Sequence, residues 1–151
     1  MNDGMTTHHS SAVLIGSKAV LIRGPSGAGK SSLAWGLIAA GRQGLIPFAL
    51  LVGDDRVELA AMHGRLLVRP AQSLAGLLEI SGLGIRKLTF EPVAQVRFVV
   101  DLGPPGPERL PKPEAATVMV ESIPLPRLAV ASGDAALPVI LAFLRTQTAG
   151  D

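Results

Sequence analysis

The stretch GPSGAGKS, residues 24–31, decides the fold of this chain. It matches the complete pattern G-x-x-x-x-G-K-[ST] of a phosphate-binding loop, in which closely spaced glycines let backbone N–H groups point at an anion. The β-rich run KAVLIRG (18–24) leads into it, and SSLAWGLIAAG (31–41), with apolar residues at helical spacing, follows and ends at Gly41. Because strand, loop and helix stand in the order that this loop requires, the pattern favours an α/β domain over a chance glycine-rich turn.

The loop predicts a nucleotide site whose expected cofactors are ATP and Mg²⁺. Lys30 is placed to reach the β- and γ-phosphates, and the hydroxyl of Ser31 is placed to bind Mg²⁺. The helix that begins at Lys30 adds the positive end of its dipole. The candidate ATP-binding residues are Gly24, Pro25, Ser26, Gly27, Ala28, Gly29, Lys30, Ser31 and Ser32.

Two adjacent acids end the next apolar run. FALLVGD (48–54) is continuously apolar, as in a strand buried on both faces, and it stops at Asp54 and Asp55. In a phosphate-loop domain one such acid is delivered to Mg²⁺ or its water. Since alternate residues of a strand face opposite ways, the second acid points elsewhere and can serve as a general base. The alternative is a charged turn in which Arg56 neutralises one acid.

The composition indicates one compact globular domain over residues 1–151, with residues 1–10 as a flexible N-terminal tail. Hydrophobic residues make up 48% of the 151 residues and charged residues 17%, the net charge is +2, and there is no cysteine. No Lys/Arg cluster suggests a nucleic-acid partner, and no signal peptide or membrane-spanning stretch stands out, so we expect a cytoplasmic protein. A mean hydropathy of +0.40 suggests that partner subunits cover some apolar surface.

The remaining patterns predict a strand-rich domain with few helices. SAVLIG (11–16) and KAVLIRG (18–24) suggest a hairpin, as does RVELAAMHGRLLVR (56–69) around a turn at His63. QVRFVVDLG (95–103) predicts a further strand, and TVMVESIPLPRLAV (117–130) two edge strands broken by Pro124 and Pro126. PAQSLAGLLEISGLGIRKLTF (70–90) reads as an apolar turn and a glycine-rich loop, GPPGPERLPKPE (103–114) as a proline loop, and DAALPVILAFLRTQT (134–148) as a helix with Pro138 in its first turn.

Three segments together resemble the catalytic domain of the HPr kinase/phosphorylase family. They are GPSGAGKSS, GDDRVEL and LLEISGLGI (77–85), which match that family's phosphate loop, its strand ending in Asp-Asp-Arg/Asn-Val and its Leu-Glu-Ile-x-Gly-Leu-Gly-Ile signature in order and approximate spacing over residues 9–102. The chain looks like the short form found in alphaproteobacteria. The resemblance implies an ATP-dependent serine kinase that phosphorylates an HPr-type phosphocarrier of a phosphotransferase system, with a hexameric habit.

The resemblance also implies roles for single residues. Asp55 matches the residue that takes the proton from the HPr serine, which leaves Asp54 to the metal, and Glu79 matches a metal-associated carboxylate. His9, next to His8, matches a catalytic-site histidine. In PERLPKP, Arg109 matches a catalytic arginine near the transferred phosphoryl group.

Plainer interpretations stand beside these. Glu79 could be a solvated loop carboxylate, His9 a tail residue and Arg109 a surface arginine. The family segment linked to dephosphorylation appears here as IPLPRLAV (123–130), which keeps Ile-Pro and Arg127 only, so the reverse, phosphorolytic reaction stays open. From other classes, the alternatives are a small-molecule phosphate-loop kinase and a non-enzymatic ATP-binding sensor, since ATP binding needs the loop alone whereas transfer also needs Asp55.

Overall fold

A computed structural model describes residues 4–103, 116–131 and 133–146 of the chain. In this part the fold is strand-rich, with two α-helices, and the expected α/β class is confirmed. In chain order the elements are β1 Thr6–His8, β2 Ser10–Ile15, β3 Lys18–Arg23, α1 Lys30–Arg42, β4 Ala49–Gly53, β5 Val57–Met62, β6 Arg65–Pro70, the 3₁₀ turn η1 Gln72–Leu74, β7 Leu77–Ile80, β8 Gly84–Lys87, β9 Ala94–Leu102, β10 Thr117–Val120, β11 Ile123–Val130 and α2 Gly133–Arg145.

A nine-stranded sheet carries the fold, and β3 lies near its middle. Its main path runs β1-β5-β6-β9-β3-β2-β4, and β10 and β11 join through the pairing of β11 with β9. The pairs β3–β9 and β9–β11 are parallel, whereas the other pairs of this sheet are antiparallel. The carboxyl ends of β3, β9 and β11 therefore meet at one edge, from which the phosphate loop departs.

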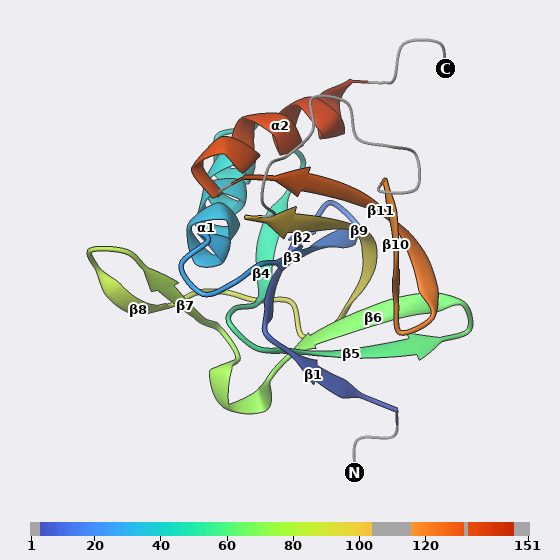
Figure 1. Cartoon of the computed structure of the whole chain (residues 1–151). Helices are drawn as coiled ribbons and strands as arrows, with labels where there is room; N and C mark the ends of the chain where they lie inside the picture. Colours follow the sequence, from blue (N-terminus) through green and yellow to red (C-terminus); the bar gives the residue numbers. More distant parts are fainter. Residues whose placement is uncertain (1–3, 104–115, 132, 147–151) are drawn as a thin grey trace.

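The two faces of the central strands bury separate cores. Val20 and Ile22 of β3 belong to a core shared with α1 and α2. Ala19 and Leu21, which alternate with them, belong to a second core with β5, β6 and β10. Figure 1 shows the two helices side by side on one side of the central strands, and the β5–β6 hairpin, which is part of the same sheet, on the other side. Burial on both faces explains why the strand sequences are continuously apolar.

The structure differs from the sequence-based expectation at the N-terminus and in the signature segment. Residues 6–8 of the expected tail form β1, which pairs antiparallel with β5 from Thr6↔Leu59 to His8↔Val57. The expected glycine loop after residue 78 is a hairpin, β7–β8, paired from Leu77↔Lys87 to Ile80↔Gly84. Its glycines supply the turn, since Gly82 and Gly84 have φ of 82° and 95°.

Three proline and glycine expectations also change. The helix α1 passes Gly41 and is capped at Gln43. Pro138 lies inside α2, beyond its first turn. Pro124 and Pro126 do not break β11: Arg127 N–H donates to Ala116 O, so the backbone nitrogens of Ile123 and Leu125 face β10 while those of the prolines face away, where no N–H is required.

Gly41 packs closely against β4 and yields a stability prediction. A Cβ on Gly41 would lie 2.8 Å from the Cβ and 3.0 Å from the backbone N of Ala49 in β4. We expect Gly41→Ala to lower the free energy of unfolding by about 1–3 kcal/mol in urea denaturation, despite the better helix propensity of alanine.

Gly36, one and a half turns earlier in the same helix, provides the matched control. A Cβ there would lie 3.1 Å from the flexible Leu137 side chain and no closer to any other atom. Gly36→Ala should therefore be neutral or stabilising by up to about 1 kcal/mol. Equal effects of the two substitutions would contradict the close approach of α1 and β4.

Candidate active site

The phosphate loop has the geometry of an anion cradle. Gly27 and Gly29 adopt φ of 85° and 99°, and the α1 N-terminus after Gly29 carries neither a side-chain cap nor an acidic residue in its first turn. Its first N–H groups thus remain available to a bound anion. Lys30 folds back over the loop, where its Nζ donates to Gly24 O at 2.7 Å and to Pro25 O at 3.3 Å.

The loop also lies tight against the end of β9. A Cβ on Gly24 would come within 2.9 Å of Leu102 O, so only glycine lets the loop leave the sheet along this path. Glycine is therefore required at residue 24 because the loop backbone passes too close to the backbone of Leu102 for a side chain to fit.

Asp54 is a buried carboxylate that three hydrogen-bond donors hold in place. Its side chain is 4% exposed. The Ser31 hydroxyl lies 2.8 Å from both carboxylate oxygens, the Ser11 hydroxyl donates to Oδ1 at 2.6 Å, and the Glu79 backbone N–H donates to Oδ2 at 3.3 Å. The strand-end acid and the loop serine, each expected near the metal, are thus in direct contact.

Asp55 occupies a different environment although it is the next residue. It is exposed, with φ of 68° in the left-handed region, and its N–H donates to the Ser11 hydroxyl at 3.3 Å. The two acids therefore separate into one buried and one solvent-facing carboxylate. The alternative of a charged turn neutralised by Arg56 finds no support, since Asp54 is buried and, among the described residues, Arg56 forms no ion pair with either acid.

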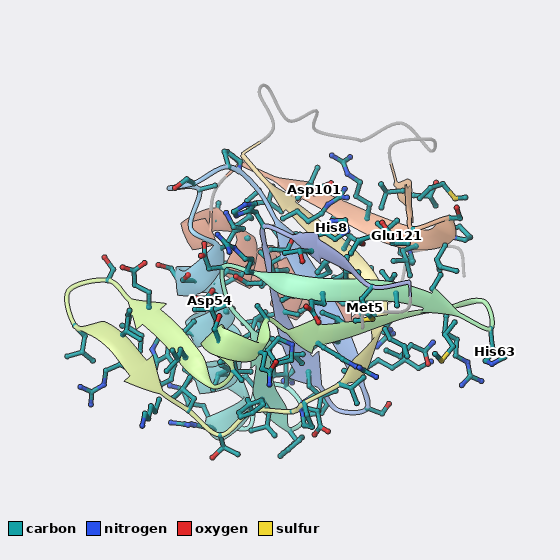
Figure 2. The ribbon with its side chains drawn as sticks, turned by 90° about the horizontal axis from the view of Figure 1, so that it is seen from below. Met5, His8, Asp54, His63, Asp101 and Glu121 are labelled. Carbon is teal, nitrogen blue, oxygen red and sulfur yellow. The ribbon has the colours of Figure 1, made fainter. Side chains whose placement is uncertain are left out.

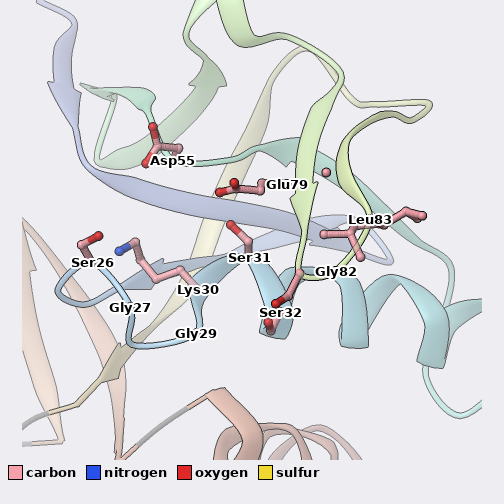
Figure 3. Close-up of a pocket in the computed structure, with 13 residues that line it drawn as sticks. Ser26, Gly27, Gly29, Lys30, Ser31, Ser32, Asp55, Glu79, Gly82 and Leu83 are labelled. Carbon is pink, nitrogen blue, oxygen red and sulfur yellow. The ribbon is translucent and has the colours of Figure 1, made fainter.

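An open pocket of about 630 Å³ lies between the phosphate loop and the β7–β8 hairpin. Figure 3 shows Lys30, Ser31, Asp55 and Glu79 around this space, with the hairpin turn near Gly82 and Leu83 as the opposite wall. The lining residues are Ser26, Gly27, Gly29, Lys30, Ser31, Ser32, Asp55, Glu79, Ile80, Ser81, Gly82, Leu83 and Gly84.

A second pocket, of about 190 Å³, adjoins the acids and has a more apolar wall. It shares Ser31, Asp55 and Glu79 with the larger pocket, so these three residues stand between the two spaces. Its remaining lining residues are Asp54, Leu74, Leu77 and Ile85.

The site fits a magnesium ion whose ligands are mostly water and phosphate oxygens. Among the described residues there is no group of three or more His, Cys, Asp or Glu side chains arranged to hold a metal by themselves. Mg²⁺ normally takes only one or two carboxylates from the protein and the rest of its shell from water and phosphate oxygens. The Ser31 hydroxyl with the adjoining Asp54 and Glu79 supplies that kind of partial set.

The structure does not bring every expected residue to the pocket. His9 is exposed between β1 and β2 and lines neither pocket, although its neighbour Ser10 pairs with Arg23 at the start of the phosphate loop. His8 instead lies 2.9 Å from the Thr6 hydroxyl and 3.4 Å from Glu121. Arg109 lies outside the described residues.

Sequence reasoning missed an ion-pair cluster beside the loop. Asp101, at the carboxyl end of β9, accepts from Arg23 Nε at 2.8 Å and Nη2 at 2.9 Å, and also from Arg127 Nε. Burial raises the pKa of Asp101, but the hydrogen bonds from the two arginines outweigh it and hold the pKa below 3.8. The same contact with Asp101 raises the pKa of Arg23, against the effect of burial.

The cluster fixes the strand ends from which the phosphate loop and residue 103 depart. In the sequence, the only sign of this cluster is a charged residue at the end of each of two apolar runs, Arg23 in IRG and Asp101 in VDLG. Neither run indicates which residue the charge will pair with. Arg127, from the segment IPLPRLAV (123–130), thus contacts Asp101 and lines neither pocket.

Comparison with known proteins places the chain. The sequence model of the family described as HPr Serine kinase C-terminal domain matches residues 4–90. These residues include the phosphate loop, both acids and the β7–β8 hairpin. The chain belongs to this family. The HPr kinase/phosphorylase of Clostridium beijerinckii is 37% identical over 84 residues, 56% of this chain and 26% of that protein. That of Streptococcus thermophilus is 43% identical over 81 residues, 53% and 24% of the two chains.

The chain therefore spans about a quarter of the length of these curated relatives. Among solved structures, the Hpr(Ser) kinase/phosphatase from Coxiella burnetii superposes with a TM-score of 0.73, covering 93% of this chain and 94% of that one at 24% identity. This match supports the fold of the HPr kinase-type domain over nearly the whole chain. Within the described residues, no helix is both long and apolar enough to cross a membrane.

The depressed pKa of Asp101 predicts a pH dependence of stability. A carboxyl whose folded pKa lies below its unfolded value stabilises the protein above the unfolded pKa, near 3.8, and loses that contribution as the pH falls through the folded pKa. We expect Asp101→Asn to lower the free energy of unfolding at pH 7 by about 1–3 kcal/mol, since two arginines lose their charged acceptor. The penalty should shrink when urea denaturation is repeated near pH 3.

Glu91→Gln is the control. It removes the same charge as Asp101→Asn, but Glu91 forms no ion pair within the described residues. It should change stability by less than about 0.5 kcal/mol. A loss for Asp101→Asn that stays constant between the two pH values would contradict the ion-pair explanation.

Proposed function

We propose that the protein is a serine kinase that transfers the γ-phosphoryl group of ATP to an HPr-type phosphocarrier protein of a phosphotransferase system. One observation carries the proposal: Lys30, Ser31, Asp55 and Glu79 line a single pocket in a chain of the HPr kinase family. These side chains are of the types that phosphoryl transfer requires, namely a phosphate-binding lysine, a metal-binding hydroxyl and two carboxylates.

The donor side is the phosphate loop. ATP with Mg²⁺ would supply the transferable phosphoryl group and neutralise part of its charge. The backbone N–H groups around Gly27 and Gly29 would hold the phosphates. Lys30 would exchange its contacts with the Gly24 and Pro25 carbonyl oxygens for phosphate oxygens, and Ser31, Asp54 and Glu79 would hold the metal with its water.

The acceptor side is the smaller pocket. Asp55 borders both spaces and is exposed, as a base that must receive a proton from an incoming serine hydroxyl has to be. The volume of about 190 Å³ suits an amino-acid side chain rather than a nucleoside. Leu74, Leu77 and Ile85 would contact apolar side chains that flank the acceptor serine.

The same carboxylate would serve the reverse reaction. Protonated Asp55 would give its proton to the serine oxygen as inorganic phosphate attacks the phosphorus of the phosphoserine, so that the serine O–P bond breaks and the phosphoryl group leaves as pyrophosphate. The curated relatives carry both activities in their names. We propose phosphorolysis as the second activity of this chain, with Arg127 acting through Asp101 on the strand ends rather than in the pocket.

We further propose a cytoplasmic homo-oligomer, hexameric by family resemblance. Val139 and Phe143 on α2 are large apolar residues that remain exposed on the single chain. Such residues are typical of surfaces that a neighbouring subunit covers.

Phosphotransfer with and without Asp55 tests the proposed function. Wild type and Asp55→Asn would be incubated with γ-labelled ATP, Mg²⁺ and purified HPr-type proteins of the same organism. We expect serine labelling by the wild type to fall by about 10²–10⁴ in the variant, because the base is removed, while ATP binding measured by calorimetry is retained. No labelling by wild type that binds ATP would favour the sensor, and labelling of a metabolite instead would favour a small-molecule kinase.

Ile85 tests the acceptor pocket. Its side chain is 68% exposed on β8 and lines the smaller pocket but not the larger one. We expect Ile85→Ser to raise the KM for the phosphocarrier at least about 5-fold, which corresponds to about 1 kcal/mol of lost contact, and to leave the KM for ATP unchanged.

Met119→Ser is the matched control, since Met119 is 63% exposed and lies on β10, away from both pockets. It should alter neither KM. A rise in the KM for ATP with Ile85→Ser would assign the smaller pocket to the nucleotide instead.

A further inference from the structure

We propose that Ser11 is a positioning residue that fixes the geometry of both acids of the site. Ser11 lies in β2, the strand next to β3, which leads into the phosphate loop. It belongs to none of the three family segments and lines neither pocket, and its side chain is completely buried. Its effect on phosphoryl transfer rests on the proposed function. The contacts on which it depends are present whatever the substrate.

One hydroxyl contacts both acids. The Ser11 Oγ donates its hydrogen to Asp54 Oδ1 at 2.6 Å and accepts the backbone N–H of Asp55 at 3.3 Å. A hydroxyl can do both at once, because it has one donor and two acceptor lone pairs. Figure 2 shows Asp54 in the interior of the fold, where such donors cannot be replaced by bulk water.

The backbone of Asp55 needs this support. Its φ of 68° lies in the left-handed region, which costs a non-glycine residue about 1–2 kcal/mol, although aspartate tolerates it better than most. The N–H of Asp55 points at Ser11 in this conformation. Without an acceptor there, the peptide loses a bond that favours the left-handed turn, and the carboxylate loses its fixed direction into the pocket.

Asp54 needs Ser11 for a second reason. Of its other two donors, the Ser31 hydroxyl is the group expected to turn toward Mg²⁺, and the Glu79 N–H contact is the longer one at 3.3 Å. Ser11 is the donor that remains when Ser31 turns away. It therefore holds Asp54 in place across the reaction cycle.

Burial alone does not explain this arrangement. Ser10 precedes Ser11 in the same strand and is 2% exposed, but its side chain faces the opposite side of β2. Among the described residues no hydrogen bond joins Ser10 to either acid. Ser10 is thus a control of the same chemistry and burial.

The test compares Ser11→Thr with Ser11→Val, which have the same shape and differ in the hydroxyl. Ser11→Ala serves as the smaller variant should both β-branched residues crowd the strand, and Ser10→Ala is the control. We expect Val and Ala at residue 11 to lower kcat for transfer about 10- to 100-fold with little change in the KM for ATP, as for groups that orient a metal ligand. Thr should restore most of kcat.

A structural readout accompanies the kinetics. Hydrogen exchange of the Asp55 amide, followed by NMR on the protein without nucleotide, should accelerate at least about 10-fold in Ser11→Ala and Ser11→Val and stay near wild type in Ser11→Thr and Ser10→Ala. Unchanged Asp55 exchange in Ser11→Ala, or equal kinetic losses in Ser11→Ala and Ser10→Ala, would overturn the assignment. If the wild type transfers no phosphoryl group to HPr, the proposed function fails, while the exchange pattern still decides the role of Ser11.

Discussion

The buried carboxylate of Asp54 is the constraint on which the site and much of the fold depend. An ionised carboxylate that is 4% exposed costs several kcal/mol unless donors surround it. Its donors come from β2, from the first turn of α1 and from β7. The hydrogen bonds to this one carboxylate therefore fix the phosphate loop, the β2–β3 hairpin and the β7–β8 hairpin relative to one another. Among the described residues no buried side-chain polar atom is left without a partner.

Local sequence signals were enough to predict the parts of the fold that neighbouring residues determine. The β2–β3 and β5–β6 hairpins have short turns between apolar runs, and the phosphate loop has its own pattern. The β7–β8 hairpin was missed because β8 is exposed along its whole length, so no apolar alternation marks it. The strand β1 was missed for a related reason: its polar residues become a strand only by pairing with β5, about fifty residues later.

The residues in and around the candidate site likewise fall into those that local sequence patterns predict and those that they do not. Lys30, Ser31, Asp55 and Glu79 could be predicted because they stand in recognisable segments, and the structure brings them to one pocket. Ser11 and Asp101 could not, since their partners lie 43 and 78 residues away and nothing local identifies them. His9 is the opposite case: its motif position led us to expect it at the site, and its side chain lines neither pocket.

Asp54 and Asp55 are adjacent in sequence, yet one is buried and the other is exposed. A strand would place consecutive side chains on opposite faces, but both faces of this sheet are buried cores, so a second carboxylate within β4 would have no water. The chain instead leaves β4 at Gly53, keeps Asp54 inside with its donors, and turns left-handed at Asp55. This turn moves the next carboxylate from the interior to the pocket within one residue. The left-handed backbone at Asp55 is therefore the means by which a single dipeptide supplies one fixed, buried carboxylate and one accessible carboxylate, the two environments that the proposed metal and base roles require.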